Sequence, residues 1–171
     1  DIAAGNFSST EATLWEALDE VVRIDDDYIE SKQNQNDECE LGLTTVAPPD
    51  TINKYVMRVA FRRTVLRDYQ LEVQLLQGAT EITSKTLLNL PSDFTTFEWF
   101  LTKAEKDAIT DYSDLRFKFI VTKPQGGGGG RVQISWAELE VSSYSMVIDE
   151  DVILNTILEI ESPLVEKKET E

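Results

Sequence analysis

The pattern of apolar and polar positions along the chain predicts a series of short β-strands. In residues 55–63, YVMRVAFRR, every second side chain is large and apolar, which predicts a core face made of Tyr55, Met57, Val59 and Phe61. Residues 69–77, YQLEVQLLQ, and residues 115–121, LRFKFIV, repeat the same period of two. Such alternation is typical of half-buried strands in an antiparallel sheet.

Two further segments are predicted as strands from weaker patterns. Residues 81–88 follow a turn at Gly78 and are expected to run back along the preceding strand, with Ile82 and Leu88 inward. Residues 131–141 change phase, because one set of apolar positions is followed near Ala137 by the other. The first set is Val132, Ile134 and Trp136, and the second is Leu139 and Val141. This slip indicates a β-bulge or a strand covered on both faces, and the first phase predicts that Trp136 lies in the core.

One short helix and one glycine run interrupt the strands. Thr102 and Glu105 have the spacing of a capping box, which predicts a helix over residues 103–109. The five glycines of residues 126–130 predict a flexible hairpin tip, since no Gly-Lys-Ser/Thr follows them as in a phosphate-binding loop. Taken together, the elements predict an all-β protein: an antiparallel β-sandwich of jelly-roll type with one short surface helix and a C-terminal extension strand.

The C-terminal segment predicts an interaction strand. We expect residues 1–141 to form the sandwich domain and residues 142–171 to form an extension with a frayed acidic end. Residues 151–160 alternate again, and an apolar edge of this kind needs a partner, either its own sandwich or a neighbouring subunit. The residues expected at an assembly contact are Val152, Leu154, Leu158 and Ile160. A homo-oligomer is the predicted state.

Composition excludes several classes of function. The 32 acidic and 16 basic side chains leave a formal charge of -16, which argues against nucleic acid as a partner. The chain has no histidine and one cysteine, so Ser-His-Asp and Cys-His catalysis, His-ligated zinc and an internal disulfide are not available. No apolar run is long enough to cross a bilayer. The sequence therefore predicts no enzyme, no cofactor and no membrane segment.

Acidic clusters and aromatic residues offer two weaker possibilities. Residues 25–27, three aspartates, lack the spaced ligands of a calcium loop, so a solvated acidic loop is the favoured interpretation and no metal site is predicted. Capping explains Asp107, Asp111 and Asp114 equally well. Aromatic side chains near the helix could stack on sugar rings, although such residues more often belong to a core. The candidate glycan contacts are Trp99 and Tyr112.

Three segments resemble a known family. They are LWEALDEVVRIDDDYIES (residues 14–31), ITDYSDLRFKF (109–119) and VQISWAELEV (132–141). Together they resemble small β-sandwich modules found in virion proteins of tailed bacteriophages. The resemblance implies a structural role with no catalytic residues, and it places Trp15, Leu18, Tyr28 and Ile29 in the sandwich.

The leading expectation from the sequence is a non-enzymatic virion protein. A capsid decoration or cement protein on the outer surface of the particle, bound to itself and to other virion proteins, fits the resemblance, and fibre and adaptor roles are close to it. Two alternatives stay open at this point: a carbohydrate-binding adhesion module, and a secreted pilus subunit assembled by strand donation. Either of these would act outside the cell or at its surface.

Overall fold

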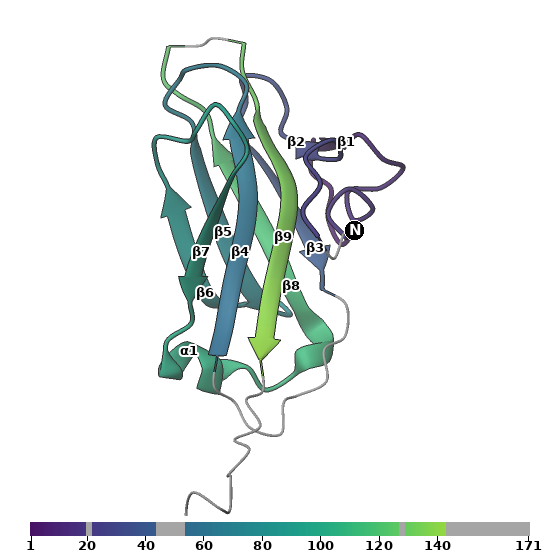
Figure 1. Cartoon of the computed structure of the whole chain (residues 1–171), viewed down its shortest axis with the longest axis vertical. Helices are drawn as coiled ribbons and strands as arrows, with labels where there is room; N and C mark the ends of the chain where they lie inside the picture. Colours follow the sequence, from purple (N-terminus) through teal and green to yellow (C-terminus); the bar gives the residue numbers. More distant parts are fainter. Residues whose placement is uncertain (20–21, 44–53, 127–128, 143–171) are drawn as a thin grey trace, which may run out of the picture.

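Two antiparallel β-sheets packed face to face form the body of the protein (Figure 1). The computed structural model describes residues 1–19, 22–43, 54–126 and 129–142. The five-stranded sheet has the order β1-β2-β9-β4-β7 and consists of β1 (Ser8–Ser9), β2 (Ile29–Glu30), β9 (Val132–Ser142), β4 (Lys54–Arg63) and β7 (Thr95–Phe100). The four-stranded sheet has the order β3-β8-β5-β6 and consists of β3 (Asp37–Gly42), β8 (Leu115–Thr122), β5 (Gln70–Gln77) and β6 (Thr80–Leu87).

The pairing of the strands is nested and confirms the predicted jelly roll. β5 pairs with β6, β4 with β7, β3 with β8 and β2 with β9, all antiparallel. A long antiparallel ribbon that is bent over itself produces this nesting, and successive pairs alternate between the two sheets. The all-β fold class predicted from the alternation of side chains is therefore correct.

Inward-facing side chains of both sheets make one continuous core. The alternation in β4 sends Tyr55, Met57, Val59 and Phe61 inward as predicted, and each of them is buried. They meet the inward row of the opposite sheet, which includes Leu71, Val73, Leu75, Phe117 and Phe119. Cys39 lies in this core, where burial raises the pKa of its thiol, so it is a packing residue and not a reactive one.

A β-bulge reverses the predicted position of Trp136. The register between β4 and β9 shifts at one point, where Phe61 pairs with Ile134 but Ala60 pairs with Trp136. Ser135 is thus an extra residue, and every later side chain of β9 changes face. Because Phe61 faces inward, Ile134 does too, whereas Trp136 follows Ala60 to the outer face. The bulge expected near Ala137 exists, but it lies at Ser135, before Trp136, so Trp136 belongs to the second phase of the strand and not to the first.

A second bulge changes the phase of β6. Leu75 pairs with Thr83 and Leu76 with Glu81, so Ile82 has no partner in the register. After this point Thr83 and Leu87 face inward, and Leu88 is 59% exposed. The strand itself is confirmed, and Ile82 packs partly against the core, but the inward position expected for Leu88 is wrong.

The glycine run does not form a hairpin tip. β8 and β9 belong to different sheets, so the segment between them connects the two layers. Gly130 is buried, and its carbonyl oxygen accepts a hydrogen bond from the Tyr69 hydroxyl at 2.6 Å. A Cβ atom at this position would overlap Cγ2 of Val65. At least this glycine is therefore required by packing.

The short helix is confirmed. α1 (Lys103–Ala108) has Thr102 as its N-cap, and the Thr102 side chain accepts from the backbone N–H of Glu105 while Glu105 accepts from the N–H of Thr102. The Glu105 carboxylate also accepts from the hydroxyl of Thr83 at 2.6 Å, which ties the helix to β6. No described helix is long and apolar enough to span a membrane.

The N-terminal segment is held against the sheets by a buried carboxylate. Asp37 accepts hydrogen bonds from the backbone N–H groups of Asn6, Lys32 and Glu38 at 2.8 to 3.0 Å. Leu18 and Ile29 are buried as predicted, whereas Trp15 and Tyr28 are half-buried. The predicted assembly contacts Val152, Leu154, Leu158 and Ile160 lie outside the described residues, as does the rest of the extension after Ser142, so that strand stays a prediction.

Candidate functional site

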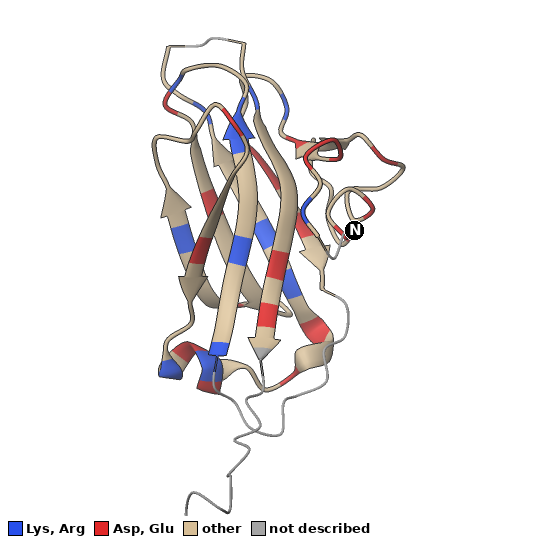
Figure 2. Cartoon of the chain, in the orientation of Figure 1, with Lys and Arg blue, Asp and Glu red and all other residues tan. Residues whose placement is uncertain are grey.

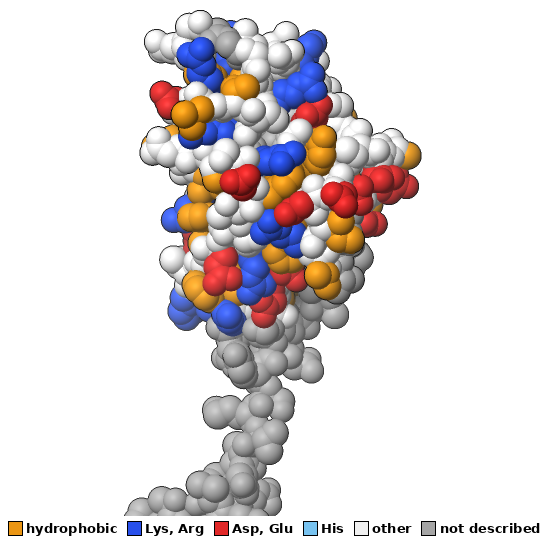
Figure 3. Space-filling model, turned by 45° about the horizontal axis from the view of Figure 1, so that its top comes forward, with side chains coloured by type: hydrophobic (Ala, Val, Ile, Leu, Met, Phe, Trp, Pro, Cys, Tyr) orange, Lys and Arg blue, Asp and Glu red, His pale blue; other side chains and the backbone are white. Residues whose placement is uncertain are grey.

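The outer face of the five-stranded sheet carries a mixed aromatic and charged surface. Strand alternation, together with the bulge in β9, turns one set of side chains of β4, β7 and β9 away from the core. We call this set the outer face. It consists of Val56, Arg58, Ala60 and Arg62 of β4, Phe94, Thr96, Glu98 and Phe100 of or next to β7, and Gln133, Trp136, Glu138 and Glu140 of β9. Acidic, basic and hydrophobic side chains alternate over the surface on this side of the molecule (Figure 3).

Arg58 is the centre of an ion-pair network on this face. Its guanidinium lies 2.8 Å from Glu98, 2.9 Å from Glu138 and 2.6 Å from Glu140. Figure 2 shows the basic band of β4 between the acidic bands of β7 and β9. The side chain of Arg58 is 19% exposed. The hydrogen bond to Glu98, with those to Glu140 and Glu138, raises the pKa of Arg58 against the opposing effect of burial.

Two aromatic rings flank this network along the strands. Phe100, opposite Val56, is 55% exposed, and the amino group of Lys54 lies 5.0 Å from the centre of its ring. Trp136 is half-buried opposite Ala60. The register places the row of Arg58 between the row of Phe100 and the row of Trp136, so charged groups alternate with ring surfaces along the face.

A polar bridge crosses the face above β4. The Ser135 hydroxyl donates to Asp25 at 2.9 Å, Asp25 pairs with Arg23, and Arg23 donates to the Thr96 hydroxyl at 3.0 Å. Ser135 belongs to β9 and Thr96 to β7, so the Arg23–Asp25 pair spans the strand between them. The hydrogen bond from Arg23, assisted by that from Ser135, lowers the pKa of Asp25 although burial acts in the opposite direction. This bridge defines the middle of the outer face.

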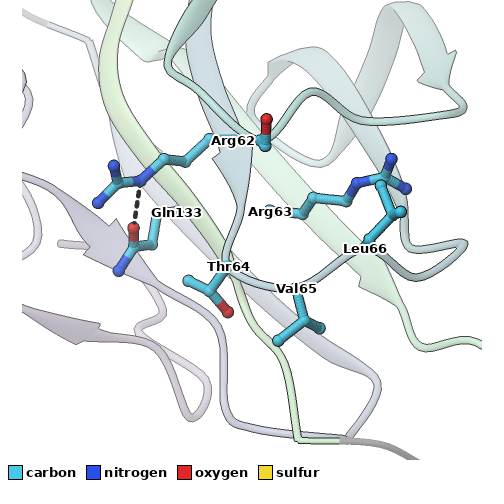
Figure 4. Close-up of a pocket in the computed structure, with 7 residues that line it drawn as sticks. Arg62, Arg63, Thr64, Val65, Leu66 and Gln133 are labelled. Atoms are coloured by element: carbon cyan, nitrogen blue, oxygen red, sulfur yellow. Dashed lines mark hydrogen bonds between the residues drawn. The ribbon is translucent and has the colours of Figure 1, made fainter.

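A pocket adjoins the outer face where β4 ends. It has a volume of about 320 Å³ and is lined by Arg62, Arg63, Thr64, Val65, Leu66, Ser92 and Gln133 (Figure 4). Arg62 lies 4.3 Å from the ring centre of Phe94 and 6.0 Å from that of Tyr28, and its Nε donates to Gln133 at 2.7 Å. Since Arg62 and Gln133 belong to the outer face as well, the face and the pocket are continuous.

The opposite face of the sandwich lacks the aromatic component. Outward side chains of the four-stranded sheet are polar or aliphatic, and Arg116 pairs there with Glu40 at 2.8 Å and Asp114 at 2.7 Å. Among its described residues this sheet directs its aromatic side chains, Phe117 and Phe119, into the core. The combination of rings and ion pairs therefore distinguishes the outer face of the five-stranded sheet.

The structure separates the aromatic residues that the sequence grouped as candidates. Trp99 is 7% exposed and faces inward beside Met57, with its ring 5.6 Å from that of Phe97, so it offers no ring surface to a sugar. Tyr112 is partly buried and its hydroxyl is hydrogen-bonded to that of Tyr55. This contact, together with burial as the larger cause, raises the pKa of Tyr55. Both candidates thus have structural contacts, and Trp99 as a glycan platform is incorrect.

Sequence reasoning missed the outer face because its key residues seemed to have other roles. Trp136 was assigned to the core from its phase with Ile134. Arg58 looked like an ordinary solvent-facing residue of β4, and only the pairing of three strands brings Glu98 and Glu138 to it. The one available signal was the phase change in β9, which implied that some of its apolar side chains face outward.

Ion pairs and capping account for the acidic residues that were considered as metal ligands. Asp25 pairs with Arg23, Asp107 with Lys103 and Asp114 with Arg116. Asp111 caps the 3-10 turn of Tyr112–Asp114, and its hydrogen bonds with Ser113 lower its pKa. Among the residues that the structure describes, no three acidic, cysteine or histidine side chains are grouped as a metal ion would require.

Comparisons with known proteins give distant matches to solved structures only. No family model and no curated protein matches the chain. A CBM4 structure has a TM-score of 0.42 and 12% identity over 82% of this chain and 80% of its own. A Family 16 Carbohydrate Binding Module-2 has a TM-score of 0.44 and 12% identity over 81% of this chain and 86% of its own. An arabinose-bound α-L-arabinofuranosidase has a TM-score of 0.44 and 12% identity, with 82% of this chain and 24% of its own covered.

These matches contradict the virion role expected from the sequence. The structures are two carbohydrate-binding proteins and a glycosidase, and none of the three is a virion protein. The expectation of a capsid decoration protein is therefore wrong. Identities of 12% and TM-scores below 0.5 assign no ligand to this chain, so the case for a ligand has to come from its own side chains.

Proposed function

We propose that the sandwich is a non-catalytic glycan-binding module that acts outside the cell and binds saccharides on the outer face of the five-stranded sheet. The observation that supports this proposal is the row of Glu98, Arg58 and Glu138 between the rings of Phe100 and Trp136. The carbohydrate-binding adhesion module, which the sequence left open as an alternative, thus replaces the virion role.

Saccharides have two kinds of surface, and the outer face matches both. The C–H groups of a pyranose ring pack on the face of an aromatic ring, and Phe100 is 55% exposed for such a contact. Hydroxyl groups both donate and accept hydrogen bonds, and carboxylates and guanidinium groups are the strongest side-chain partners for them. The spacing of β-strands, about 4.8 Å, and of alternate residues, about 7 Å, places these groups at the scale of one sugar unit.

The ion pairs also hold the polar groups in place before a ligand binds. Arg58 contacts carboxylates from both neighbouring strands, so the ion pairs restrict the conformations of all four side chains. Groups that are already ordered lose less conformational entropy on binding, which improves affinity for a weak polar ligand. A bare row of mobile lysine and glutamate side chains would not have this advantage.

A protein partner fits the outer face less well than a saccharide. The core of a protein interface is depleted in charged residues, because burying charges costs desolvation free energy. Here a network of four charged groups lies between the two rings. A saccharide leaves much of such a network hydrated and hydrogen-bonded, and so it avoids that cost.

A non-catalytic role agrees with how the carboxylates are engaged. Glycoside hydrolysis needs one carboxyl group that gives a proton to the leaving oxygen and a second that acts as base or nucleophile. Glu98, Glu138 and Glu140 all accept hydrogen bonds from one guanidinium, so each is already engaged by a fixed cation. This arrangement supports binding and not proton transfer.

Affinity electrophoresis of the full chain in gels that contain neutral polysaccharides tests the proposal. Phe100→Ala should reduce the retardation of the protein in the gel. The corresponding Kd should rise at least about tenfold, which is a loss of about 1.4 kcal/mol of binding free energy. Phe97→Ala is the matched control, because Phe97 lies on the same strand, is 38% exposed and faces the inter-sheet side. Retention of binding in Phe100→Ala and in Trp136→Ala, or failure of the wild-type chain to bind any polysaccharide in a broad panel, would reject the proposal.

A further inference from the structure

Two arginine side chains that form no close ion pair with a described residue line the pocket at the end of β4. Arg23, Arg58, Arg116 and Arg131 each pair with a carboxylate. Arg62 and Arg63 form no ion pair within 4.0 Å of any described carboxylate, although Arg62 is near enough to Asp25 to help lower the pKa of that carboxyl group. Lys and Arg positions also colour the ribbon at this end of the molecule (Figure 2). In a chain with twice as many acidic as basic residues, two adjacent arginines without a close ion pair need an explanation.

The hydrogen-bonding capacity of both guanidinium groups is only partly used. Arg62 donates from Nε to Gln133, and its two Nη groups have no partner among the described residues. Arg63 donates from Nη1 to the carbonyl oxygen of Arg67 at 2.6 Å, and its buried Nε has none. Each guanidinium carries five N–H donors, so most of the donors at the pocket remain for a ligand.

Packing holds Arg62 in a fixed orientation. Its guanidinium lies 4.3 Å from the ring centre of Phe94 and 6.0 Å from that of Tyr28, and the two rings are neighbours, with their centres 6.1 Å apart. Such cation–π contacts and the hydrogen bond to Gln133 restrict a side chain that is otherwise flexible. A planar guanidinium held in one orientation can donate two parallel hydrogen bonds to two oxygens of a carboxylate or a sulfate group.

We propose that this pocket binds the anionic substituent of an acidic polysaccharide, either a carboxylate of a uronic acid or a sulfate ester. This inference rests on the proposed function and extends it, because Arg62 and Gln133 belong to both the outer face and the pocket. A saccharide that lies along the face passes over the Arg23–Asp25 bridge, which lies between the row of Arg58 and the row of Arg62, before it reaches the pocket. The hydroxyl groups of Thr64 and Ser92 line the same pocket and provide partners for sugar hydroxyls.

The arrangement of the two arginines favours separate anionic groups along a polymer. Figure 4 shows Arg62 directed toward Gln133 on one side of the strand end and Arg63 directed toward Leu66 on the other. Consecutive residues of a strand point to opposite sides, so the two do not form a clamp around one anion. Arg62 is the principal contact, and Arg63 adds positive potential at the far side of the pocket.

The overall charge limits the ligand to a polyanion of moderate charge density. A formal charge of -16 repels a nucleic acid, whose phosphates follow each other closely and need an extended basic surface. Screening confines this repulsion to about 8 Å at physiological ionic strength, so one local cation can still capture a carboxylate. A polyuronate or sulfated glycan, with about one charge per sugar unit or fewer, meets this condition.

Binding of the full chain to polygalacturonate and to its fully methyl-esterified form tests the inference. The two polymers share one backbone, and methyl esterification removes the negative charge of each uronic acid. We expect at least about tenfold tighter binding to the charged form, loss of this preference in Arg62→Gln, and its retention in Lys123→Gln, a charge-matched change at an exposed residue outside the pocket. Arg62→Lys should keep part of the preference, since it keeps the charge and loses the fork. Thermal unfolding of each variant verifies the fold.

The outcomes separate this inference from the proposed function. Equal binding of both polymers, or an unchanged preference in Arg62→Gln, overturns the anion site while glycan binding on the outer face stands. Equal loss of neutral and acidic ligands in Arg62→Gln also overturns it, because Arg62 would then shape the face in general. Absence of binding to any polysaccharide rejects both. Tighter binding to chondroitin sulfate than to the same polymer after desulfation assigns the pocket to sulfate, and equal binding to the two forms assigns it to the carboxylate that both carry.

Discussion

Replacing Arg58 by methionine should weaken the fold moderately and glycan binding severely. Methionine keeps an unbranched apolar stem of similar length, so the change removes the charge and the hydrogen bonds and leaves most of the packing. Arg116→Met is the matched control, because Arg116 is the corresponding ion-pair centre on the opposite sheet, with Glu40 and Asp114 as its partners.

The loss of stability can be worked out from the three ion pairs. The carboxylates of Glu98, Glu138 and Glu140 are 33 to 47% exposed, so each pair with Arg58 contributes about 0.2 to 1 kcal/mol. The sum is about 1 to 3 kcal/mol, including the repulsion among carboxylates that have lost their common cation. A chain of this size loses about 2 to 4 °C in Tm for each kcal/mol. Arg116→Met, with two pairs, should lose less stability than Arg58→Met.

The pH dependence of this loss is also determined. Arg58 has a raised pKa in the folded protein, so its contribution is fully present below the ordinary arginine value and is lost only above it. The difference in free energy of unfolding between wild type and Arg58→Met should therefore be the same at pH 6 and pH 9 in urea titrations. Glycan binding at pH 7 should fall at least about tenfold for Arg58→Met and stay unchanged for Arg116→Met.

Two results would refute this reasoning. A stability loss above about 5 kcal/mol would mean that Arg58 belongs to a buried network, for which breaking a pair costs about 3 to 5 kcal/mol. Equal effects of Arg58→Met and Arg116→Met on glycan binding would mean that the two faces of the sandwich do not differ in function.

Four further predictions address the fold and the outer face. Trp136→Ala should cost about 1 to 2 kcal/mol in urea unfolding and not the 3 to 5 kcal/mol of a buried tryptophan, because its side chain is half-buried; the larger value would return it to the core. Gly130→Ala should cost about 1 to 3 kcal/mol through overlap with Val65, whereas Gly42→Ala, with its nearest contact at 3.5 Å, should be tolerated; equal melting temperatures would contradict this. Asp25→Asn should destabilise the protein at neutral pH. Because the pKa of Asp25 is lowered in the folded protein, the difference in stability between wild type and variant should disappear as the pH falls below about 3.9 and through the pKa of the folded state. A difference in melting temperature that stays constant in acid would show that the bridge is not ionic. Deletion of residues 143–171 should leave the melting temperature unchanged, since the nested strand pairs are complete at Ser142, and sedimentation velocity then decides whether the predicted strand mediates self-association.

The strands were determined by the sequence itself. Alternation of side chains is a local property, because consecutive residues of a strand point to opposite faces wherever the strand lies. It was enough to define β4, β5 and β8 and the inward positions of Tyr55 and Phe61. The helix was equally local, since the capping box of Thr102 and Glu105 involves residues three positions apart.

The outer face was decided by the tertiary structure. Arg58 meets Glu98 and Glu138, which are 40 and 80 residues away, and Arg23 meets Thr96, which is 73 residues away. Register between strands sets such contacts, and a single extra residue such as Ser135 reverses the face of all that follow it. Trp136 was therefore assigned to the wrong side of its own strand, and Trp99 was considered for a surface from which the pairing of β7 with β4 removes it.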